Sequence, residues 1–345
     1  MTGRSGPGPD GVAVVDKPAG WTSHDVVAKA RSLLGTRKVG HAGTLDPDAT
    51  GVLVLGVGRA TRLLTYLSGH DKRYVGEIVL GTATTTLDAS GEVTGTWDMG
   101  AVGLAEVRAA AATLTGEIDQ VPPMVSAKRV GGRRLHALAR EGVEVERPPV
   151  RVRVERFAVG EPVEPGVYPI DVTCSAGTYI RSLAADVGAA LGGGAHLRAL
   201  RRLASGPFGL DEAVPLDELG PDRLLPPAEA MRGRPQVTVG DDVAALVRNG
   251  RVLERDVLGI APPGGGAAGD GTAGGGAAGD GGAGGGAVGD GGAGGGAVGD
   301  GGAGGGADAP DDGPWAVVDG TGALLAVYVP HRGTTVKPGV VLVPA

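Results

Sequence analysis

A glycine-rich loop near the N-terminus carries a carboxylate that could act as a nucleophile. The loop has the sequence GHAGTLDPDATGVL over residues 40–53, and Pro47 restricts the backbone directly after Asp46. A carboxylate is ionised at pH 7, so it can attack an electron-poor carbon without help from a general base. The loop alone is also compatible with Asp46 being an ordinary turn residue before proline.

Two further segments contain the partners that such a carboxylate would need. KRYVGEIVLG at 72–81 places Tyr74 at the start of an apolar strand, and a tyrosine ring can stack on a flipped base. GTYIRSLAADVG at 177–188 places Arg181 in the first turn of a helix, where a cation is unfavourable unless it has a partner. A guanidinium paired with Asp46 would keep the carboxylate ionised and oriented. Taken singly, the tyrosine could be a core residue and the arginine a surface residue.

The elements that must position these side chains form a mixed α+β pattern over residues 11–235. A first helix is expected from the capping residues Thr22 or Ser23 to Leu34, and Gly35 stands where helices commonly end. Apolar patterns predict the other elements. Strands are expected over 12–15, 52–55, 74–80, 151–159 and 167–174, and further helices over 104–114 and 178–191.

The C-terminal part, residues 236–345, is expected to be a small β-rich domain interrupted by a tether. Residues 262–312 are dominated by a glycine-rich unit of ten residues that has no large apolar side chain to bury, so we expect a flexible, disordered linker. Around it, a helix is predicted near 241–248 and strands over 315–319, 324–329 and 340–343. Residues 1–10 are also expected to be disordered.

The net charge of −7 is unevenly distributed. Residues 1–235 hold 27 basic and 27 acidic residues, whereas residues 236–345 hold 5 basic and 12 acidic residues, so the acidity lies in the C-terminal part. The first part has basic clusters that could contact RNA or could be solvated surface. These clusters are Arg129, Arg133 and Arg134; Arg147, Arg151, Arg153 and Arg156; and Arg198, Arg201 and Arg202.

The remaining composition favours a cytoplasmic protein. The single cysteine, Cys174, cannot form an intramolecular disulfide and is expected to be a core residue. No apolar run is long enough for a membrane span, and residues 1–10 lack the apolar core of a signal peptide. No histidine, cysteine or carboxylate cluster has metal-ligand spacing.

The ordered set of motifs over about residues 11–210 resembles the TruB family of tRNA pseudouridine synthases. The matching strings are DKPAGWTSHDVV at 16–27, GHAGTLDPDATGVL at 40–53, KRYVGEIVLG at 72–81, PPMVSAKRVGGRRLHALAREG at 122–142 and CSAGTYIRSLAADVG at 174–188. The resemblance implies a pseudouridine synthase core with a mixed, largely antiparallel sheet flanked by helices, followed by a small β-rich domain of PUA type.

The resemblance also implies an activity and a role for each matching residue. The reaction would convert uridine 55 in the tRNA T loop to pseudouridine, by a monomer that needs no metal or organic cofactor and no protein partner. Asp46 would be the nucleophile, attacking C6 of the uracil or C1′ of the ribose. The implied roles of the others are stacking on the uracil for Tyr74, pairing with Asp46 for Arg181, lining the pocket for Tyr179 and Leu200, packing beneath the site for Lys17, and wedging into the tRNA loop for His41.

Residues 122–147 correspond to a mobile RNA-binding thumb in the family. Lys128, Arg129, Arg133 and Arg134 would follow the phosphates there, because basic side chains on a flexible loop can order on binding. An ordinary exposed loop is the alternative.

Two departures from the family pattern stand out. Asp48 takes a place that is usually apolar, and it would raise the pKa of Asp46 if the two were close, although alternation along the chain should point them apart. The acidic C-terminal part is also unusual for an RNA-binding domain. Rival functions are an RNA-binding protein or tRNA-folding chaperone, and a guide-RNA-dependent pseudouridine synthase.

Overall fold

The computed structural model describes residues 8–126, 129–130, 133–134, 141, 143, 145–262 and 313–343. The expected N-terminal disorder over residues 1–7, Lys128 and the whole repeat region therefore lie outside the described residues. Within the described part, no helix is long and apolar enough to cross a membrane.

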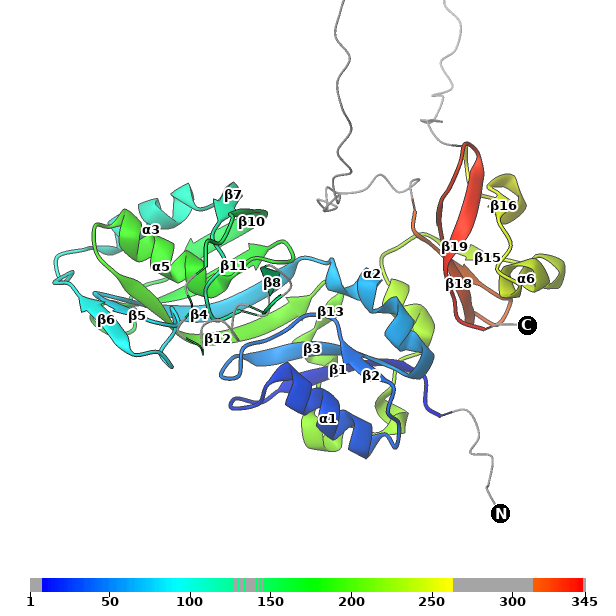
Figure 1. The fold of residues 1–345 in the computed structure, drawn as a ribbon, viewed down its shortest axis with the longest axis horizontal. Helices are drawn as coiled ribbons and strands as arrows, with labels where there is room; N and C mark the ends of the chain where they lie inside the picture. Colours follow the sequence, from blue (N-terminus) through cyan, green and yellow to red (C-terminus); the bar gives the residue numbers. More distant parts are fainter. Residues whose placement is uncertain are drawn as a thin grey trace, which may run out of the picture.

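A ten-stranded mixed sheet forms the first part of the molecule (Figure 1). Its main path is β14-β1-β3-β12-β4-β11-β10-β7, with β2 paired to β3 and β13 to β12. Its pairings are antiparallel except β1 with β14 and β12 with β3, so the largely antiparallel mixed sheet is confirmed. The strands are β1 (Gly11–Lys17), β2 (Val39–His41), β3 (Thr50–Val57), β4 (Lys72–Leu80), β7 (Gly116–Gln120), β10 (Val150–Val159), β11 (Val167–Cys174), β12 (Ala195–Ser205), β13 (Phe208–Gly209) and β14 (Val214–Pro215).

The helices and short hairpins pack around this sheet. Helix α1 begins with a capping box between Thr22 and Asp25, and Gly35 follows it with a positive φ, as its sequence predicts. The α-helices of this part are α1 (Ser23–Leu33), α2 (Leu64–Ser68), α3 (Leu104–Thr113) and α5 (Ile180–Ala190); the hairpins are β5 (Thr82–Thr84) with β6 (Val93–Thr96) and β8 (Arg129–Val130) with β9 (Arg133–Arg134).

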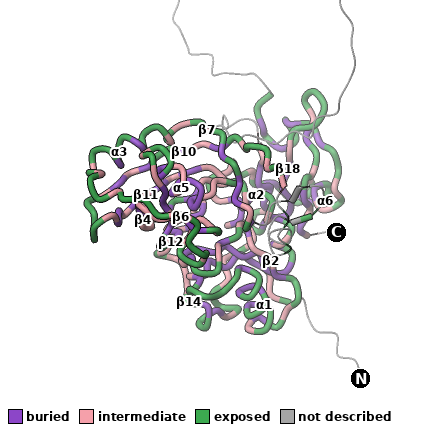
Figure 2. The backbone as a smooth tube through the Cα atoms, turned by 60° about the vertical axis from the view of Figure 1, so that its left-hand side comes forward, coloured by how far each residue is buried: buried purple, intermediate pink, exposed green. Residues whose placement is uncertain are grey.

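Strands β1 and β3 are buried on both faces, which explains their unbroken apolar sequences. Ala13, Val15, Leu53 and Leu55 point into a core shared with α1, α3 and α5. The alternating residues Val12, Val14, Val52 and Val54 point to a second core that includes residues of the C-terminal sheet. In Figure 2, buried segments run through the interior of the molecule and exposed segments lie mainly at its periphery.

The C-terminal elements form a separate five-stranded sheet with the order β15-β17-β18-β19-β16. Its elements are β15 (Gln236–Thr238), α6 (Asp241–Arg248), β16 (Leu253–Glu254), β17 (Trp315–Val318), β18 (Leu324–Pro330) and β19 (Thr335–Val341). The expected β-rich C-terminal part is confirmed. The strand predicted over 340–343 lies earlier in the chain, because β19 spans Thr335–Val341. Its pairing with β18 contains a register shift and includes Pro338.

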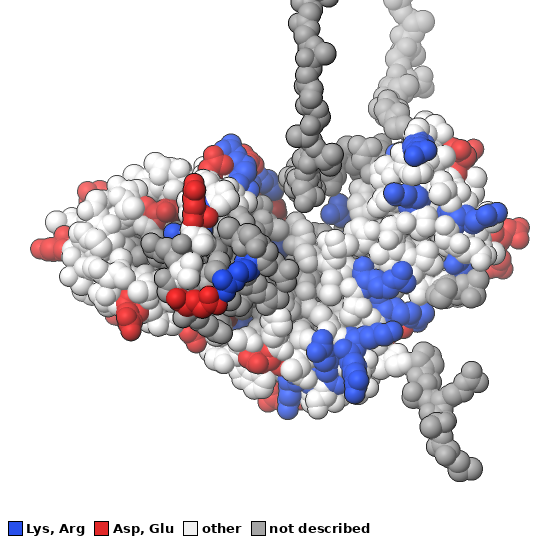
Figure 3. Space-filling view, viewed as in Figure 1, with Lys and Arg blue, Asp and Glu red and all other residues white. Residues whose placement is uncertain are grey.

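The acidity of the C-terminal part does not lie on this sheet. All seven excess acidic residues fall in 263–312, whereas the described C-terminal residues hold five basic and five acidic residues. Figure 3 shows Lys and Arg side chains gathered on the face that runs from the region of α1 to the C-terminal sheet. The net charge therefore does not argue against an RNA partner for the folded part.

Strand β12 is a central element that the sequence patterns do not predict. Its sequence, AHLRALRRLAS, is rich in strong helix formers, but the strand lies between β3 and β4. Register shifts at Leu197/Ala199 and Arg202/Ala204 bend it against β4. Tertiary pairing thus overrides local propensity and brings Leu200 and Arg202 to the same cavity.

Gly51 is a residue of β3 that pairs with Arg202 of β12, and the space between the two strands there leaves no room for a side chain. Its φ is +100°, and an added Cβ would lie 2.2 Å from the backbone oxygen of Arg202. We expect Gly51→Ala to lower the free energy of unfolding by at least about 1–3 kcal/mol, measured by chemical denaturation. Gly69→Ala is the matched control, because Gly69 has a φ of −78° and open space around its Cα. Equal stability of the two variants would contradict this packing.

Candidate active site

The loop that carries Asp46 lies between β2 and β3 and is fixed through its own backbone. The Ser23 hydroxyl at the start of α1 accepts a hydrogen bond from the Leu45 N–H (2.9 Å) and donates one to the Leu45 carbonyl (3.2 Å). The Lys17 ammonium donates to the Pro47 carbonyl (2.8 Å). The Arg202 guanidinium donates to the carbonyl of Gly43 (3.2 Å). These contacts hold the loop on both sides of Asp46, so its carboxylate is presented in one orientation.

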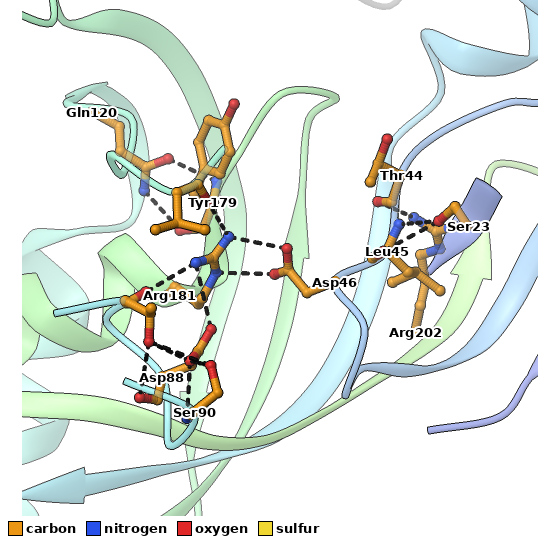
Figure 4. A network of polar contacts seen from close by, with 12 residues as sticks. Ser23, Thr44, Leu45, Asp46, Asp88, Ser90, Gln120, Tyr179, Arg181 and Arg202 are labelled. Carbon is orange, nitrogen blue, oxygen red and sulfur yellow. Dashed lines mark hydrogen bonds and ion pairs between the residues drawn. The ribbon is translucent and has the colours of Figure 1, made fainter. Parts of the chain in front are cut away.

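Arg181 binds the Asp46 carboxylate through two points. The distances are 2.9 Å from Nε to Oδ2 and 3.0 Å from Nη2 to Oδ1 (Figure 4). The arginine side chain is 5% exposed, whereas 39% of the Asp46 side chain remains accessible. Arg181 therefore orients the acid from the protein side and leaves its other side open to a ligand.

Arg181 also ties this acid to two other segments. Its Nη2 donates to the Val125 carbonyl (2.9 Å), at the start of the segment expected to be the thumb. Its Nη1 donates to the Thr86 carbonyl (2.9 Å) and lies 3.4 Å from Oδ2 of Asp88. Four segments that are distant in sequence therefore meet at one guanidinium.

Asp88 is a residue of this network that the sequence analysis does not single out. The hydroxyls of Thr86 and Ser90 each donate to its Oδ1 at 2.6 Å, which fixes the carboxylate (Figure 4). Leu87 between them has a φ of +63°, a strained conformation for a leucine. The only local signal was the alternation of threonine, aspartate and serine, which is typical of many surface turns.

The second carboxylate that acts on Asp46 is therefore Asp88 and not Asp48. Burial is the largest cause that raises the pKa of Asp46, and Asp88 adds to it, while Arg181 opposes both. Asp48 is exposed on the loop after Pro47, as the alternation predicts. The Arg181 guanidinium thus lowers the pKa of Asp46 in surroundings that would otherwise favour the protonated acid.

A cavity of about 250 Å³ opens in front of Asp46. Tyr74, Tyr179 and Leu200 line it together with Arg181, so four residues singled out from the sequence meet the acid there. Tyr74 is only 7% exposed, and burial raises the pKa of its phenol. Tyr179 is fixed by Gln120, whose amide oxygen accepts from the Tyr179 N–H (2.7 Å) and whose amide nitrogen donates to its carbonyl (3.0 Å).

Two buried cations lie on another side of the same cavity. Arg202 is 1% exposed, donates to Val52 O (2.7 Å) and pairs in register with Tyr74 across β12 and β4. Lys72 is 7% exposed, and burial together with Arg202 lowers its pKa to about 8. The expectation that Arg202 belongs to a basic cluster that contacts RNA or solvent is wrong, because its side chain is buried and supports the Asp46 loop from inside.

Six other arginines of the candidate RNA-binding clusters have acidic or carbonyl partners. Arg201 pairs with Asp16 (2.7 Å), and Arg198 pairs with both Glu77 (2.7 Å) and Glu164 (3.0 Å). The remaining described pairs are Arg153 with Asp71, Arg151 with Glu117 and Asp119, Arg147 with the Pro122 carbonyl, and Arg133 with Glu141. Several of these ion pairs are more than one third exposed, so each contributes little to stability.

Lys17 and His41 do not line the cavity but contact the loop that carries Asp46. Lys17 is fully buried and donates to the carbonyls of Pro18 (2.9 Å), Trp21 (2.6 Å) and Pro47; burial lowers its pKa to about 8. His41 is half-buried, and its Nδ1 accepts from the Gly43 N–H (3.4 Å). Its ring lies edge-to-face with that of His24, with centroids 5.4 Å apart.

The thumb residues are described only in part. The backbones of Arg129 and Arg134 pair across the β8–β9 hairpin, and the Arg133 side chain is about half exposed. Lys128 lies outside the described residues. The side chain of Arg133, the one that the structure describes among these four, pairs with Glu141 and does not line the cavity.

Alternative chemistries have little support at this site. Cys174 is 1% exposed, and burial raises the pKa of its thiol to about 11, which disfavours the thiolate. Among the described residues, no three His, Cys, Asp or Glu side chains are grouped so that they could hold a metal ion.

Comparison with known proteins connects this site to a family. Residues 31–180 match the model for the N-terminal domain of TruB family pseudouridylate synthases, and residues 181–225 match that for the C-terminal domain of tRNA pseudouridylate synthase B. A tRNA pseudouridine synthase B from Symbiobacterium thermophilum is 52% identical over 246 residues, which are 70% of this chain and 82% of that protein. This chain belongs to the TruB family. A tRNA pseudouridine synthase B from Nocardia farcinica is 51% identical over 76% of this chain and 87% of its own length.

Solved structures give the same assignment of fold. A chain of a Cbf5–Nop10–Gar1 complex matches 97% of this TruB family member with a TM-score of 0.65 and 25% identity, covering 85% of that chain. A chain of an H/ACA RNP bound to a substrate RNA matches all of it with a TM-score of 0.63 and 22% identity. The pseudouridine synthase fold with its C-terminal β-rich part is thereby confirmed.

Proposed function

We propose that this TruB family member isomerises uridine 55 in the T loop of tRNA to pseudouridine, with Asp46 as the nucleophile. The observation that carries the proposal is the two-point contact between Arg181 and Asp46 at a cavity lined by Tyr74 and Leu200. An oriented carboxylate beside an aromatic wall suits a flipped uracil, which needs a flat partner and a nearby nucleophile.

The reaction rearranges bonds within one nucleotide. Asp46 attacks C6 of the uracil or C1′ of the ribose, and the bond between C1′ and N1 breaks. The uracil turns, a bond forms between C1′ and C5, and the bond to Asp46 breaks, which regenerates the carboxylate. The proton on C5 leaves to solvent, and N1 gains a proton. Product and substrate are isomers, so no oxidant, reductant or group donor is required.

The other residues have supporting roles in this proposal. Tyr74 stacks on the flipped uracil and assists proton movement, Tyr179 and Leu200 confine it, and Lys17 holds the loop from beneath. His41 enters the opened tRNA loop. Lys128, Arg129, Arg133 and Arg134 contact phosphates from the thumb, and the protein acts as a monomer without a protein partner.

A bare T-arm stem-loop tests the proposal. Pure protein should convert the uridine that corresponds to position 55, detected by pseudouridine mapping of the RNA after incubation, and should leave a stem-loop with cytidine at that position unchanged. One structural relative belongs to an H/ACA RNP bound to a substrate RNA. If conversion required an added guide RNA, or if the RNA were bound but never modified, this proposal would be wrong.

A further inference from the structure

An exposed tryptophan lies beside the catalytic loop and has no role in the chemistry described above. Trp21 is 38% exposed in the turn between β1 and α1. Its carbonyl and that of Pro47, directly after Asp46, both accept hydrogen bonds from the Lys17 ammonium. Figure 1 shows the β1–α1 and β2–β3 loops ending next to each other.

The contacts that fix this turn do not require an indole. Lys17 uses only the backbone oxygen of residue 21, and the capping box uses atoms of Thr22 and Asp25. Any residue at position 21 could keep these bonds. The large, partly exposed ring therefore stands on a rigid backbone as an available flat surface.

The position of Trp21 fits the energetic needs of base flipping. When a uridine leaves the RNA stack, the faces of its neighbouring bases lose their stacking partner, and an aromatic side chain can replace it. Arg181, which binds Asp46, also donates to the carbonyl of Val125, whose side chain is 36% exposed. The segments that contact the Asp46 loop and its arginine thus carry exposed apolar side chains, and Trp21 is the aromatic one.

We infer that Trp21 is a stacking platform for an unpaired nucleobase adjacent to the target uridine. The inference rests on the proposed function for the identity of the RNA. Because stacking occurs on binding and does not change the reacting atoms, its loss should raise KM and leave kcat unchanged.

Steady-state kinetics on the T-arm stem-loop test this inference with a matched control. Trp21→Ala should raise KM roughly tenfold, and Trp21→Phe should restore most of the affinity, because phenylalanine keeps an aromatic face. Trp97→Ala is the control: Trp97 is 44% exposed in the distant segment after β6, where its ring covers Gly95 and Gly194. Equal KM values for Trp21→Ala, Trp97→Ala and the unmodified protein would overturn the inference.

Fluorescence provides a readout that is independent of turnover. The chain has three tryptophans, and Trp315 is 2% exposed, so Trp97→Phe leaves Trp21 as the one exposed indole. In the Asp46→Asn background, added stem-loop should quench this emission, and the quenching should vanish when Trp21→Phe replaces Trp97→Phe. Unchanged Trp21 emission on a saturated complex would overturn the inference. Failure of the unmodified protein to form pseudouridine would instead refute the proposed function, and the fluorescence titration would still decide whether Trp21 contacts RNA.

Discussion

Asp46→Asn should abolish pseudouridine formation and preserve both the fold and RNA binding. The amide has nearly the same shape as the carboxylate, but it is a poor nucleophile and carries no charge for Arg181 to orient. We expect product formation to fall by at least about 10⁴-fold, as is found when a catalytic group that acts in a unit is removed. Pseudouridine mapping of the stem-loop and a binding titration with the same RNA measure the two properties.

Asp48→Asn is the control for this variant. Asp48 is the second acid of the same loop and is exposed, whereas the ion pairs of Arg181 are with Asp46 and Asp88. It should retain the activity of the unmodified protein. Turnover by Asp46→Asn at the normal rate would refute the assignment of the nucleophile. If the Asp46→Asn protein replaced the unmodified protein in cells, the tRNA-folding role would be favoured.

Arg181→Met should have the second-largest effect. It removes the two-point contact that orients Asp46 and leaves Asp46 and Asp88 facing each other without the cation. Misplacement of a reacting group by about 1 Å can cost roughly 10²-fold in rate, so we expect kcat to fall by at least that factor. Arg73→Met is the control, because Arg73 forms an exposed ion pair with Asp171 away from the cavity and should keep full activity.

The pH dependence separates the electrostatic part of this effect from simple loss of structure. Burial and Asp88 raise the pKa of Asp46, and Arg181 lowers it. Since the ionised acid is the reactive form, activity is lost as pH falls through that pKa. Arg181→Met should therefore move the acid limb of the kcat profile to higher pH, and Asp88→Asn should move it to lower pH. Shifts of the same sign in both variants would contradict the network.

The sequence predicts elements well where local signals and tertiary structure agree. Helix α1 has its capping residue, its apolar face and its terminal glycine in the expected places. Strand β11 and helix α6 have the expected bounds. Strand β12 was not predicted, because its leucine, alanine and arginine residues favour a helix when considered alone, and only its pairing with β4 makes it a strand.

The same distinction applies to the site. The meeting of Asp46 and Arg181, 135 residues apart, was anticipated because both belong to recognisable motifs. Asp88 and Arg202 were not anticipated in their structural roles. Asp88 lies in a segment with the composition of a surface turn, and Arg202 lies in a basic run that resembles an RNA-binding cluster. Whether the Arg202 guanidinium faces solvent or a neighbouring carbonyl depends on the bends of β12, which no local pattern encodes.

The hydrogen on C5 of the target uridine must be lost if Asp46 drives the proposed rearrangement, so its release reports on the reaction itself. Pure protein is incubated with tRNA whose uridines carry tritium at C5, and tritium in water is counted against pseudouridine at position 55. One tritium should be released for each pseudouridine formed, with no change in the mass of unlabelled RNA and no release by Asp46→Asn. Product without tritium release, or release that persists in Asp46→Asn, would contradict it.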